Sequence, residues 1–337
     1  MSNRIKIFFL VFVSQLAVVI FSCAAQDPQF SQFYSAQLYM NPAFTGNTIQ
    51  DRVTVNYRKQ WPGISGAFES YAFSYDHKFS EKNSALGIQV IRDKAGSGGL
   101  KFTNIGGLYS YVAKLSRKHF VRGGLRLGYT WRALDYAKLT FADQLIREGD
   151  VETIEPIKEK RSYFDIATGF VYFSEIYWIG VAFNHLNRPN QSFIGIKSRL
   201  SVKFDIHGGI TLPVKKNVKG QAIISVTIAA NYKAQQKWDQ LDIGAYFRYD
   251  PLILGIWYRG IPLLKSYQPG YANNDALILL IGYHLKAYRL RLGYSYDITI
   301  SPLRSHTGGA HEISLSYEYA PPEWKKKRNF IIPCASF

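Results

Sequence analysis

The polar residues best suited to chemistry lie close to the C-terminal end of the chain. Ser305, His306, His311 and Glu312 supply a nucleophile, two bases and a carboxylate within eight residues. Such groups catalyse acyl transfer when each lies within hydrogen-bond reach of the next. His311 and Glu312, however, are adjacent in a segment that alternates like a β-strand, so their side chains point to opposite faces. We therefore expect no hydrolase site here.

Other signatures of catalysis are also missing from the sequence. Residues 95–99 (Ala-Gly-Ser-Gly-Gly) are rich in glycine, but no helical pattern follows them, as a phosphate-binding loop requires. The seven histidines lack the spacing of metal ligands, and the chain has only two cysteines, Cys23 and Cys334. The sequence predicts a protein that is not an enzyme and that needs neither a metal nor another cofactor.

The elements that position these residues show an alternation with a period of two. In residues 121–132 one face carries Val121, Gly123, Leu125, Leu127, Tyr129 and Trp131, and the other carries Arg122, Gly124, Arg126, Gly128, Thr130 and Arg132. Residues 288–297 repeat this pattern, with Arg289 and Arg291 on the polar face. An arginine that faces lipid costs several kcal/mol near the bilayer midplane. We therefore predict a cationic lumen lined by Arg122, Arg126, Arg132, Arg289 and Arg291.

Fourteen segments alternate in this way, and bacterial outer-membrane barrels have an even number of strands. They are residues 52–61, 68–79, 84–92, 100–115, 119–132, 162–174, 176–186, 199–212, 221–233, 240–249, 252–259, 275–286, 288–297 and 310–319. Long and tight connections follow one another, as extracellular loops and periplasmic turns do. The pattern predicts an all-β, antiparallel, up-and-down transmembrane barrel over residues 51–320, with both termini in the periplasm.

The first 25 residues have the pattern of a targeting signal. Arg4 and Lys6 precede an apolar stretch, and small residues precede Gln26, so residues 1–25 are predicted to be a signal peptide. Lipoprotein processing at Cys23 is the alternative. Loss of the two basic residues lowers the formal charge from +17 to +15. A secreted barrel meets outer-membrane lipid rather than nucleic acid, so we expect no nucleic-acid partner despite the basic charge.

Residues 26–50 do not alternate, and they predict a short helix instead. Asp27 can cap it with Pro28 in its first turn, and Phe30, Phe33 and Tyr34 would then share one face. Asn41-Pro42 would end it. Two placements remain open: a periplasmic helix below the barrel, or a plug inside the lumen.

The last segment, residues 321–337, carries the basic run Lys325, Lys326, Lys327 and Arg328. Such a run is commonly a solvated tail. The functional alternative is contact with a periplasmic partner or with anionic headgroups.

Several short motifs lie along the mature chain. The most specific block is Gln26 to Tyr34 followed by Met40 to Gly46, which contains Asp27, Pro28, Phe30, Phe33, Tyr34, Asn41 and Pro42. The later blocks are residues 57–62 (YRKQWP), 141–144 (FADQ), 185–189 (HLNRP), 255–260 (GIWYRG) and 308–314 (GGAHEIS). These blocks and their order resemble the PorP/SprF family of the type IX secretion and gliding systems of Bacteroidota.

The resemblance implies an outer-membrane barrel that helps secreted proteins, often adhesins, to reach or stay on the cell surface. Its implied partners are the C-terminal sorting domain of such a substrate and periplasmic proteins linked to peptidoglycan or to the secretion machinery. The alternative is a passive porin for anionic solutes, which the predicted lumen arginines would attract. Acidic residues such as Asp165, Asp205 and Asp242 could instead neutralise those arginines.

Overall fold

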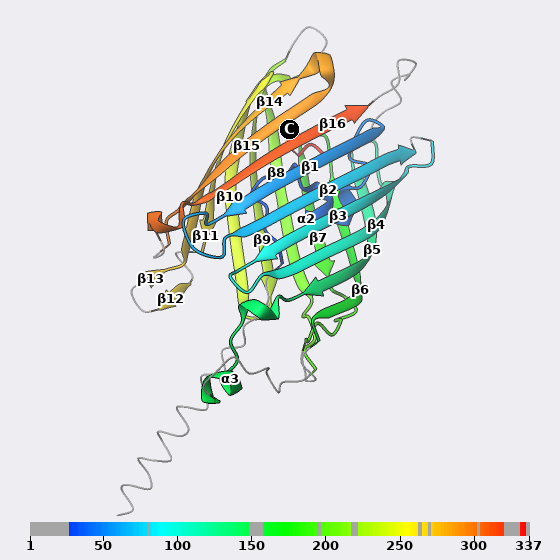
Figure 1. The fold of residues 1–337 in the computed structure, drawn as a ribbon. Coiled ribbons are helices and arrows are strands. Elements are labelled where there is room, and N and C mark those ends of the chain that lie inside the picture. Colours follow the sequence, from blue (N-terminus) through cyan, green and yellow to red (C-terminus); the bar gives the residue numbers. More distant parts are fainter. Residues whose placement is uncertain are drawn as a thin grey trace, which may run out of the picture.

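Fourteen antiparallel strands close into one barrel in the computed structural model (Figure 1). The structure describes residues 27–79, 81–147, 158–193, 197–216, 222–261, 265–268, 271–301, 304–319 and 331–334. The barrel strands are β1 (Asp51–Gln60), β2 (Phe68–Phe79), β3 (Ser84–Ala95), β4 (Leu100–Lys114), β5 (Phe120–Ala133), β6 (Lys160–Phe173), β7 (Tyr177–Asn184), β8 (Lys203–Lys216), β9 (Ala222–Gln235), β10 (Trp238–Tyr249), β11 (Leu252–Gly260), β14 (Asn274–Leu285), β15 (Leu290–Thr299) and β16 (Ala310–Tyr319). The predicted barrel is confirmed, and pairing of β1 with both β2 and β16 closes it.

The remaining elements are short. The segments β12 (Ser266–Gln268) and β13 (Tyr271–Ala272) form a separate pair, and α3 (Ala142–Ile146) follows η2 (Tyr136–Lys138). Two further turns of 3-10 helix are η3 (Lys286–Tyr288) and η4 (Arg304–Thr307). Among the described residues, no helix is long and apolar enough to cross a membrane.

We call the end of the barrel that holds the β5–β6 connection the loop end, and the opposite end the turn end. The predicted alternation of long and tight connections is wrong at two places on the loop end. β3 and β4 are joined by Gly96–Gly99 alone, and β9 and β10 by Gln236 and Lys237. Gln236 has a positive φ of 55°, which permits so tight a turn.

Another boundary also differs from the prediction. β8 continues through Pro213 to Lys216, although Pro213 was expected to open a turn. The strand pairing shifts register between Pro213 and Lys215, and proline, which has no N–H to donate, is tolerated at such an irregularity.

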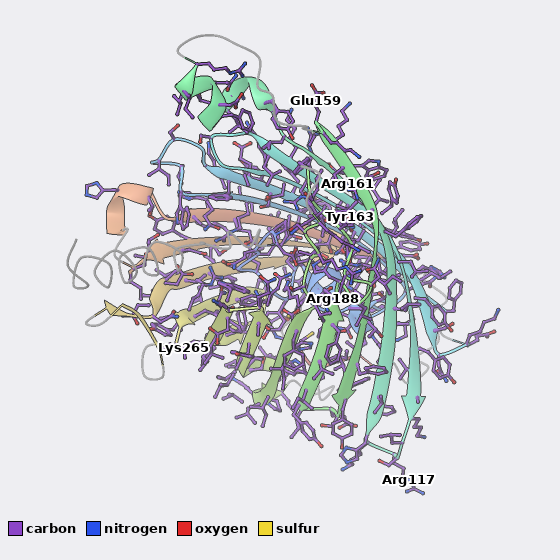
Figure 2. The ribbon with its side chains drawn as sticks, turned by 90° about the horizontal axis from the view of Figure 1, so that it is seen from below. Arg117, Glu159, Arg161, Tyr163, Arg188 and Lys265 are labelled. Carbon is purple, nitrogen blue, oxygen red and sulfur yellow. The ribbon has the colours of Figure 1, made fainter. Side chains whose placement is uncertain are left out.

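The two faces of the sheet are reversed relative to a soluble protein. In β1, Arg52, Thr54, Asn56 and Arg58 are buried, whereas the side chain of Val55 between them is 43% exposed. Figure 2 looks onto the loop end and shows side chains radiating outward from the wall while others fill the interior. An apolar exterior around a polar interior, with no open sheet edge, is the arrangement that lipid demands.

The interior of the barrel is filled by residues 27–49, which we call the plug. It contains the helix α2 (Gln37–Met40) and the turn η1 (Pro42–Phe44), seen in blue within the barrel in Figure 1. The longer helix expected from Pro28 onward does not form, and Asp27 caps no helix. Phe30, Phe33 and Tyr34 are nevertheless all buried. Because the wall surrounds the plug, its side chains find partners on every side and need no single apolar face.

The C-terminal segment 331–334 also lies inside the barrel, at the turn end. Ile332 and Cys334 are buried there against the plug. Residues 321–337 were expected to form a basic periplasmic tail, and these four residues of it lie in the lumen instead. The basic run Lys325 to Arg328 lies outside the described residues.

Candidate functional site: the plugged lumen

Ser31 of the plug forms a cluster of hydrogen bonds with two arginines and two acids of the wall. The Ser31 hydroxyl donates to Asp297 at 2.6 Å and accepts hydrogen bonds from Arg58 at 2.8 Å and Arg259 at 3.0 Å. Its backbone N–H donates to Glu312 at 2.6 Å. Arg58 and Arg259 both pair with Asp297, at 2.8 and 3.0 Å. The side chain of Ser31 therefore joins strands β1, β11 and β15, and its backbone N–H adds β16.

All five residues of this cluster are buried, so the charges depend on one another. Glu312 also accepts from the backbone N–H of Gln32 at 3.2 Å, and Arg259 pairs with Asp242 at 2.7 Å. A buried ion pair gives little net stability, but the loss of one partner leaves an uncompensated charge. The cluster therefore specifies the position of the plug backbone.

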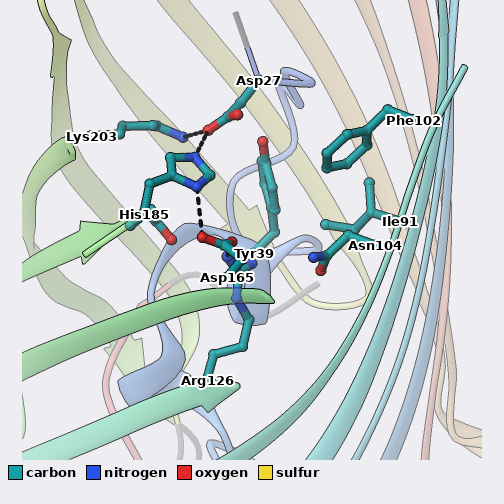
Figure 3. A pocket seen from close by; sticks show the side chains of 10 residues that line it. Asp27, Tyr39, Ile91, Phe102, Asn104, Arg126, Asp165, His185 and Lys203 are labelled. Atoms are coloured by element: carbon teal, nitrogen blue, oxygen red, sulfur yellow. Dashed lines mark hydrogen bonds and ion pairs between the residues drawn. The ribbon is translucent and has the colours of Figure 1, made fainter. Parts of the chain in front are cut away.

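The first described residue of the plug, Asp27, lies near the loop end, because its partner His185 directly follows β7 there. Figure 3 shows Asp27 beside His185 and Lys203. His185, which follows β7, lies between two carboxylates, 2.9 Å from Asp27 and 2.8 Å from Asp165. Lys203 approaches Asp27 to 3.6 Å, and Arg126 pairs with Asp165 at 2.8 Å. Together these side chains line a narrow pocket with Tyr39.

His185 and Asp27, which both lie outside the strands, have strongly shifted pKa values. Burial alone would lower the pKa of His185, but Asp27 and Asp165 outweigh that effect and raise the pKa to about 9. Burial alone would also raise the pKa of Asp27, yet His185 and Lys203 hold the pKa of this carboxyl well below its usual range. The end of the plug is therefore anchored by a charged histidine between two carboxylates at neutral pH.

The middle of the plug is held by neutral groups. The Asn41 side chain donates to the backbone carbonyl of Val181 at 3.0 Å and lies 3.0 Å from Nε2 of His207. Its own carbonyl accepts from Ala43 N–H at 2.9 Å, which caps η1. Phe44 lies against the ring of His207, with 5.2 Å between ring centroids.

Two glycines of the wall allow this part of the plug to approach closely. A Cβ atom on Gly124 would lie 2.3 Å from backbone atoms of Pro42 and Ala43. A Cβ atom on Gly169 would lie 2.0 Å from the Asn41 side chain. Both distances are far below van der Waals contact, so the plug and wall fit here only because these positions are glycine.

At the turn end, the plug is again bound by charged residues of the wall. Asp76 accepts from Gly46 N–H at 2.7 Å and pairs with Arg52 at 3.0 Å. Glu318 accepts from the Thr48 hydroxyl at 2.6 Å and from Ile49 N–H at 2.9 Å. The plug is thus tied to the wall along its whole described length.

The structure separates the predicted lumen arginines into two groups. Arg122, Arg126 and Arg132 face the lumen and are buried, and Arg291 pairs with Glu318 at 2.8 Å. Arg289 does not lie on the lumen face as expected. β15 begins only at Leu290, and Arg289 is exposed in a left-handed turn with a φ of 57°, 5.7 Å from the ring of Tyr319.

The predicted motif residues Asp27, Pro28, Phe30, Phe33, Tyr34, Asn41 and Pro42 all belong to the plug. Phe33 packs against Trp257 with 5.1 Å between ring centroids, and Tyr34 meets Tyr246 edge-on at 4.9 Å. Ser31 and its partners Arg58, Arg259 and Asp297 were not predicted as site residues, and the fourth partner, Glu312, was considered only for acyl transfer. A signal was available for three of these partners, because the motif blocks 57–62, 255–260 and 308–314 contain Arg58, Arg259 and Glu312.

The residues considered for acyl transfer do not come together. His311 is exposed on the outer face of β16, with 2.9 Å between its Nδ1 and the Tyr294 hydroxyl. Glu312 is buried in the lumen beside Ser31. His306 is exposed in η4, and the side chain of Ser305 lies outside the described residues.

The closed wall, apolar exterior and polar lumen define the protein as an outer-membrane β-barrel. Within this class the chain belongs to the PorP/SprF family, described as type IX secretion system membrane proteins, whose sequence model matches residues 22–317. The predicted family is therefore confirmed. A search of curated proteins finds no match.

Several solved structures are similar in fold. The P. putida toluene transporter TodX is 10% identical over 85% of this chain and 94% of its own, with a TM-score of 0.48. A Pseudomonas aeruginosa FadL homologue is 11% identical over 83% of this chain and 93% of its own, with a TM-score of 0.43. The KdgM porin in complex with disordered oligogalacturonate is 8% identical over 80% and 99% of the two chains, with a TM-score of 0.37.

Proposed function

We propose that this barrel assists the export or surface anchoring of a secreted, adhesin-like protein by the type IX secretion and gliding machinery. The substrate would be recognised through its C-terminal sorting domain. Membership of the PorP/SprF family supports this role. The observation that carries it is the plug: a lumen filled by the chain's own residues 27–49 favours a docking component over a conduit for solutes.

The proposed orientation follows from the connections. The loop end, with the long β5–β6 connection, faces the cell exterior, and the turn end faces the periplasm. Residues 1–25 are removed as a signal peptide in this scheme. Partners linked to peptidoglycan or to the secretion machinery would then bind at the turn end, and the substrate's sorting domain would reach the barrel from the machinery.

The alternative, a passive porin for anions, has less support from the geometry. Anion-selective pores present unneutralised cations to a water-filled passage. Arg126 pairs with Asp165 and Arg291 pairs with Glu318, while the plug occupies the space that an anion would cross.

Co-purification and conductance together test the proposal. The tagged chain, expressed in its native host, is expected to co-purify with a secreted protein that ends in a sorting domain and with periplasmic machinery. A matched strain lacking the gene should release that secreted protein into the medium or retain it inside the cell. Steady anion-selective conductance of the wild-type barrel in planar bilayers, together with unchanged secretion in the deletion strain, would contradict the proposal.

A further inference from the structure

The C-terminal segment 331–334 occupies a defined socket at the turn end of the lumen. Ile332 N–H donates to the Asn47 side chain at 2.7 Å, and the carbonyl of Pro333 accepts from the Thr211 hydroxyl at 2.7 Å. The Cys334 sulfur lies 3.4 Å from the amide nitrogen of Asn47 and 3.6 Å from that of Gln37. We call Gln37, Asn47 and Thr211 the tail socket.

The segment is bound through both its backbone and its side chains. Its two main-chain hydrogen bonds fix the register of an extended peptide, as in other modes of peptide recognition. The side chains of Ile332 and Cys334 are 1% and 5% exposed and join the buried apolar cluster that contains Phe173 and Trp178. Ile331, one residue earlier, is 36% exposed. Two adjacent isoleucines therefore differ in burial, and only Ile332 joins the apolar cluster.

The socket is built partly from the plug itself. Gln37 and Asn47 belong to the plug, and both accept hydrogen bonds from Arg52 of the wall, at 2.6 Å to the Gln37 side chain and 3.3 Å to the Asn47 carbonyl. Residues 320–330 separate β16 from the segment and can span up to about 40 Å when extended. This reach lets the chain that leaves β16 at the turn end come back into the same lumen.

We propose that the turn end of the lumen is a peptide-binding site whose ligand is the chain's own C-terminal segment, bound in cis so that it locks the plug in place. The segment bonds to Asn47 and Gln37 of the plug and to Thr211 of the wall, so in this proposal the turn end of the plug is released only when residues 331–334 withdraw. The ligand class is an extended apolar peptide with a buried isoleucine before a proline.

Cys334 gives a direct readout in the full-length protein. It is the only cysteine in residues 26–337, and burial raises the pKa of its thiol to about 12. A maleimide should therefore label it at least about 100-fold more slowly in the folded barrel than in denaturant, since only the exposed thiolate reacts. Ile332→Asn should remove most of this protection, and Ile331→Asn, the matched control, should leave it intact. Labelling of the wild type at the denatured rate, or equal labelling of the two variants, would overturn the proposal.

A second measurement does not depend on how well Ile332→Asn folds. An excess of a synthetic peptide of residues 328–337 with Cys334→Ser should displace the tail of the full-length wild type and speed the labelling of Cys334, and the same peptide that also carries Ile332→Asn should not. Equal labelling rates with the two peptides would overturn the site. Protection of Cys334 that disappears on dilution would show that the socket takes the tail of a second copy, which would overturn binding in cis.

Discussion

Two stretches of the plug are held in opposite ways. At Ser31 the wall contributes Arg58, Arg259, Asp297 and Glu312, and the contact is a network of buried charges. Ten residues later, at Asn41, the wall contributes backbone carbonyls, glycines and the buried ring of His207, and the contact is a close steric fit. Charges can be released by a competing ion or a proton, whereas a steric fit is released only when the wall or the plug moves.

We infer that the two stretches contribute differently to the attachment of the plug. Because a buried charge network gives small net stability but penalises any misplaced partner, the Ser31 stretch fixes register. The Asn41 stretch supplies dense packing, which proteins maintain at the density of organic crystals and which tolerates little added volume. Breaking the fit should therefore affect the plug more than breaking the charges does.

The largest effect is expected for Gly124→Val. Overpacking costs about 1–3 kcal/mol where side chains can relax. The added atoms here meet the backbone of Pro42 and Ala43, which cannot rotate away, so the cost should exceed that range. We expect the plug to leave its position and the barrel to conduct ions in planar bilayers, where the wild type stays closed.

Gly107→Val is the matched control, because Gly107 faces outward on β4 and has no heavy atom within 4 Å of its added Cβ. It should fold and remain closed. If Gly124→Val folds and stays as closed as Gly107→Val, the middle of the plug is not held by close packing.

An intermediate effect is expected for Arg58→Ala. It leaves Asp297 and Glu312 buried with one cation fewer, which costs about 3 kcal/mol or more when one partner of a buried pair is lost. The free energy of unfolding in urea should fall by this amount. It is measured from the fraction of protein in the folded band at each urea concentration, because folded and unfolded barrels migrate differently in SDS gels run without heating the samples.

Lys59→Ala removes the neighbouring cation, whose half-exposed side chain lies 4.0 Å from Glu69. Exposed pairs contribute about 0–1 kcal/mol, so this variant should be nearly as stable as the wild type. Equal losses for the two variants would mean that the Ser31 network is no more sensitive than the surface.

The same contrast explains what could be predicted from the sequence. Strand alternation is local, so residues 121–132 alone give the two faces of β5 and place Arg122 and Arg126 opposite Leu125 and Leu127. The failure at Arg289 is also local, because a left-handed residue before Leu290 leaves no trace in a two-residue period. The Ser31 network joins residues as much as 281 positions apart, and no periodicity reports such a contact.

The conformation of the plug could not be predicted from its sequence, and the reason is physical. Its sequence contains aromatic residues at helical spacing, which indicates a helix with one apolar face. A segment surrounded by wall on all sides needs no such face, and its backbone groups can bind wall side chains instead of one another, as Ser31 and Gln32 do with Glu312. The motif blocks, which lie far apart in the chain, were a better indication of the contacts of the plug, because residues from several of them bond to Ser31.

The smallest effect is expected at the loop end, for Asp27→Asn. This change removes one of the two carboxylates beside His185, so the pKa of His185 should fall from about 9 toward the 6.5 of a free histidine. Each pKa unit corresponds to about 1.4 kcal/mol, so the anchoring of this end should weaken by about 1–2 kcal/mol. The pKa is measured by NMR on the barrel with isotope-labelled histidine, and Asp135→Asn, which alters a loop ion pair with Lys138, should leave it at about 9.

The pH dependence has a definite sign. The pKa of His185 is higher in the folded state than in a released, solvated state, so its contribution is complete below about pH 6.5 and is lost as the pH rises through about 9. Raising the pH should therefore loosen the Asp27 end of the wild-type plug, seen as faster proteolysis of the N-terminal residues, while Asp27→Asn should already be loose at pH 7. The Asn41 stretch loses no charge as the pH rises, because its contacts are a neutral amide, backbone carbonyls, packed glycines and His207, whose buried imidazole is neutral. Proteolysis beyond Asn41 should therefore stay unchanged across that range. Cleavage that spreads through both stretches together would show that the plug is released as one unit and that the two modes of attachment are not separable.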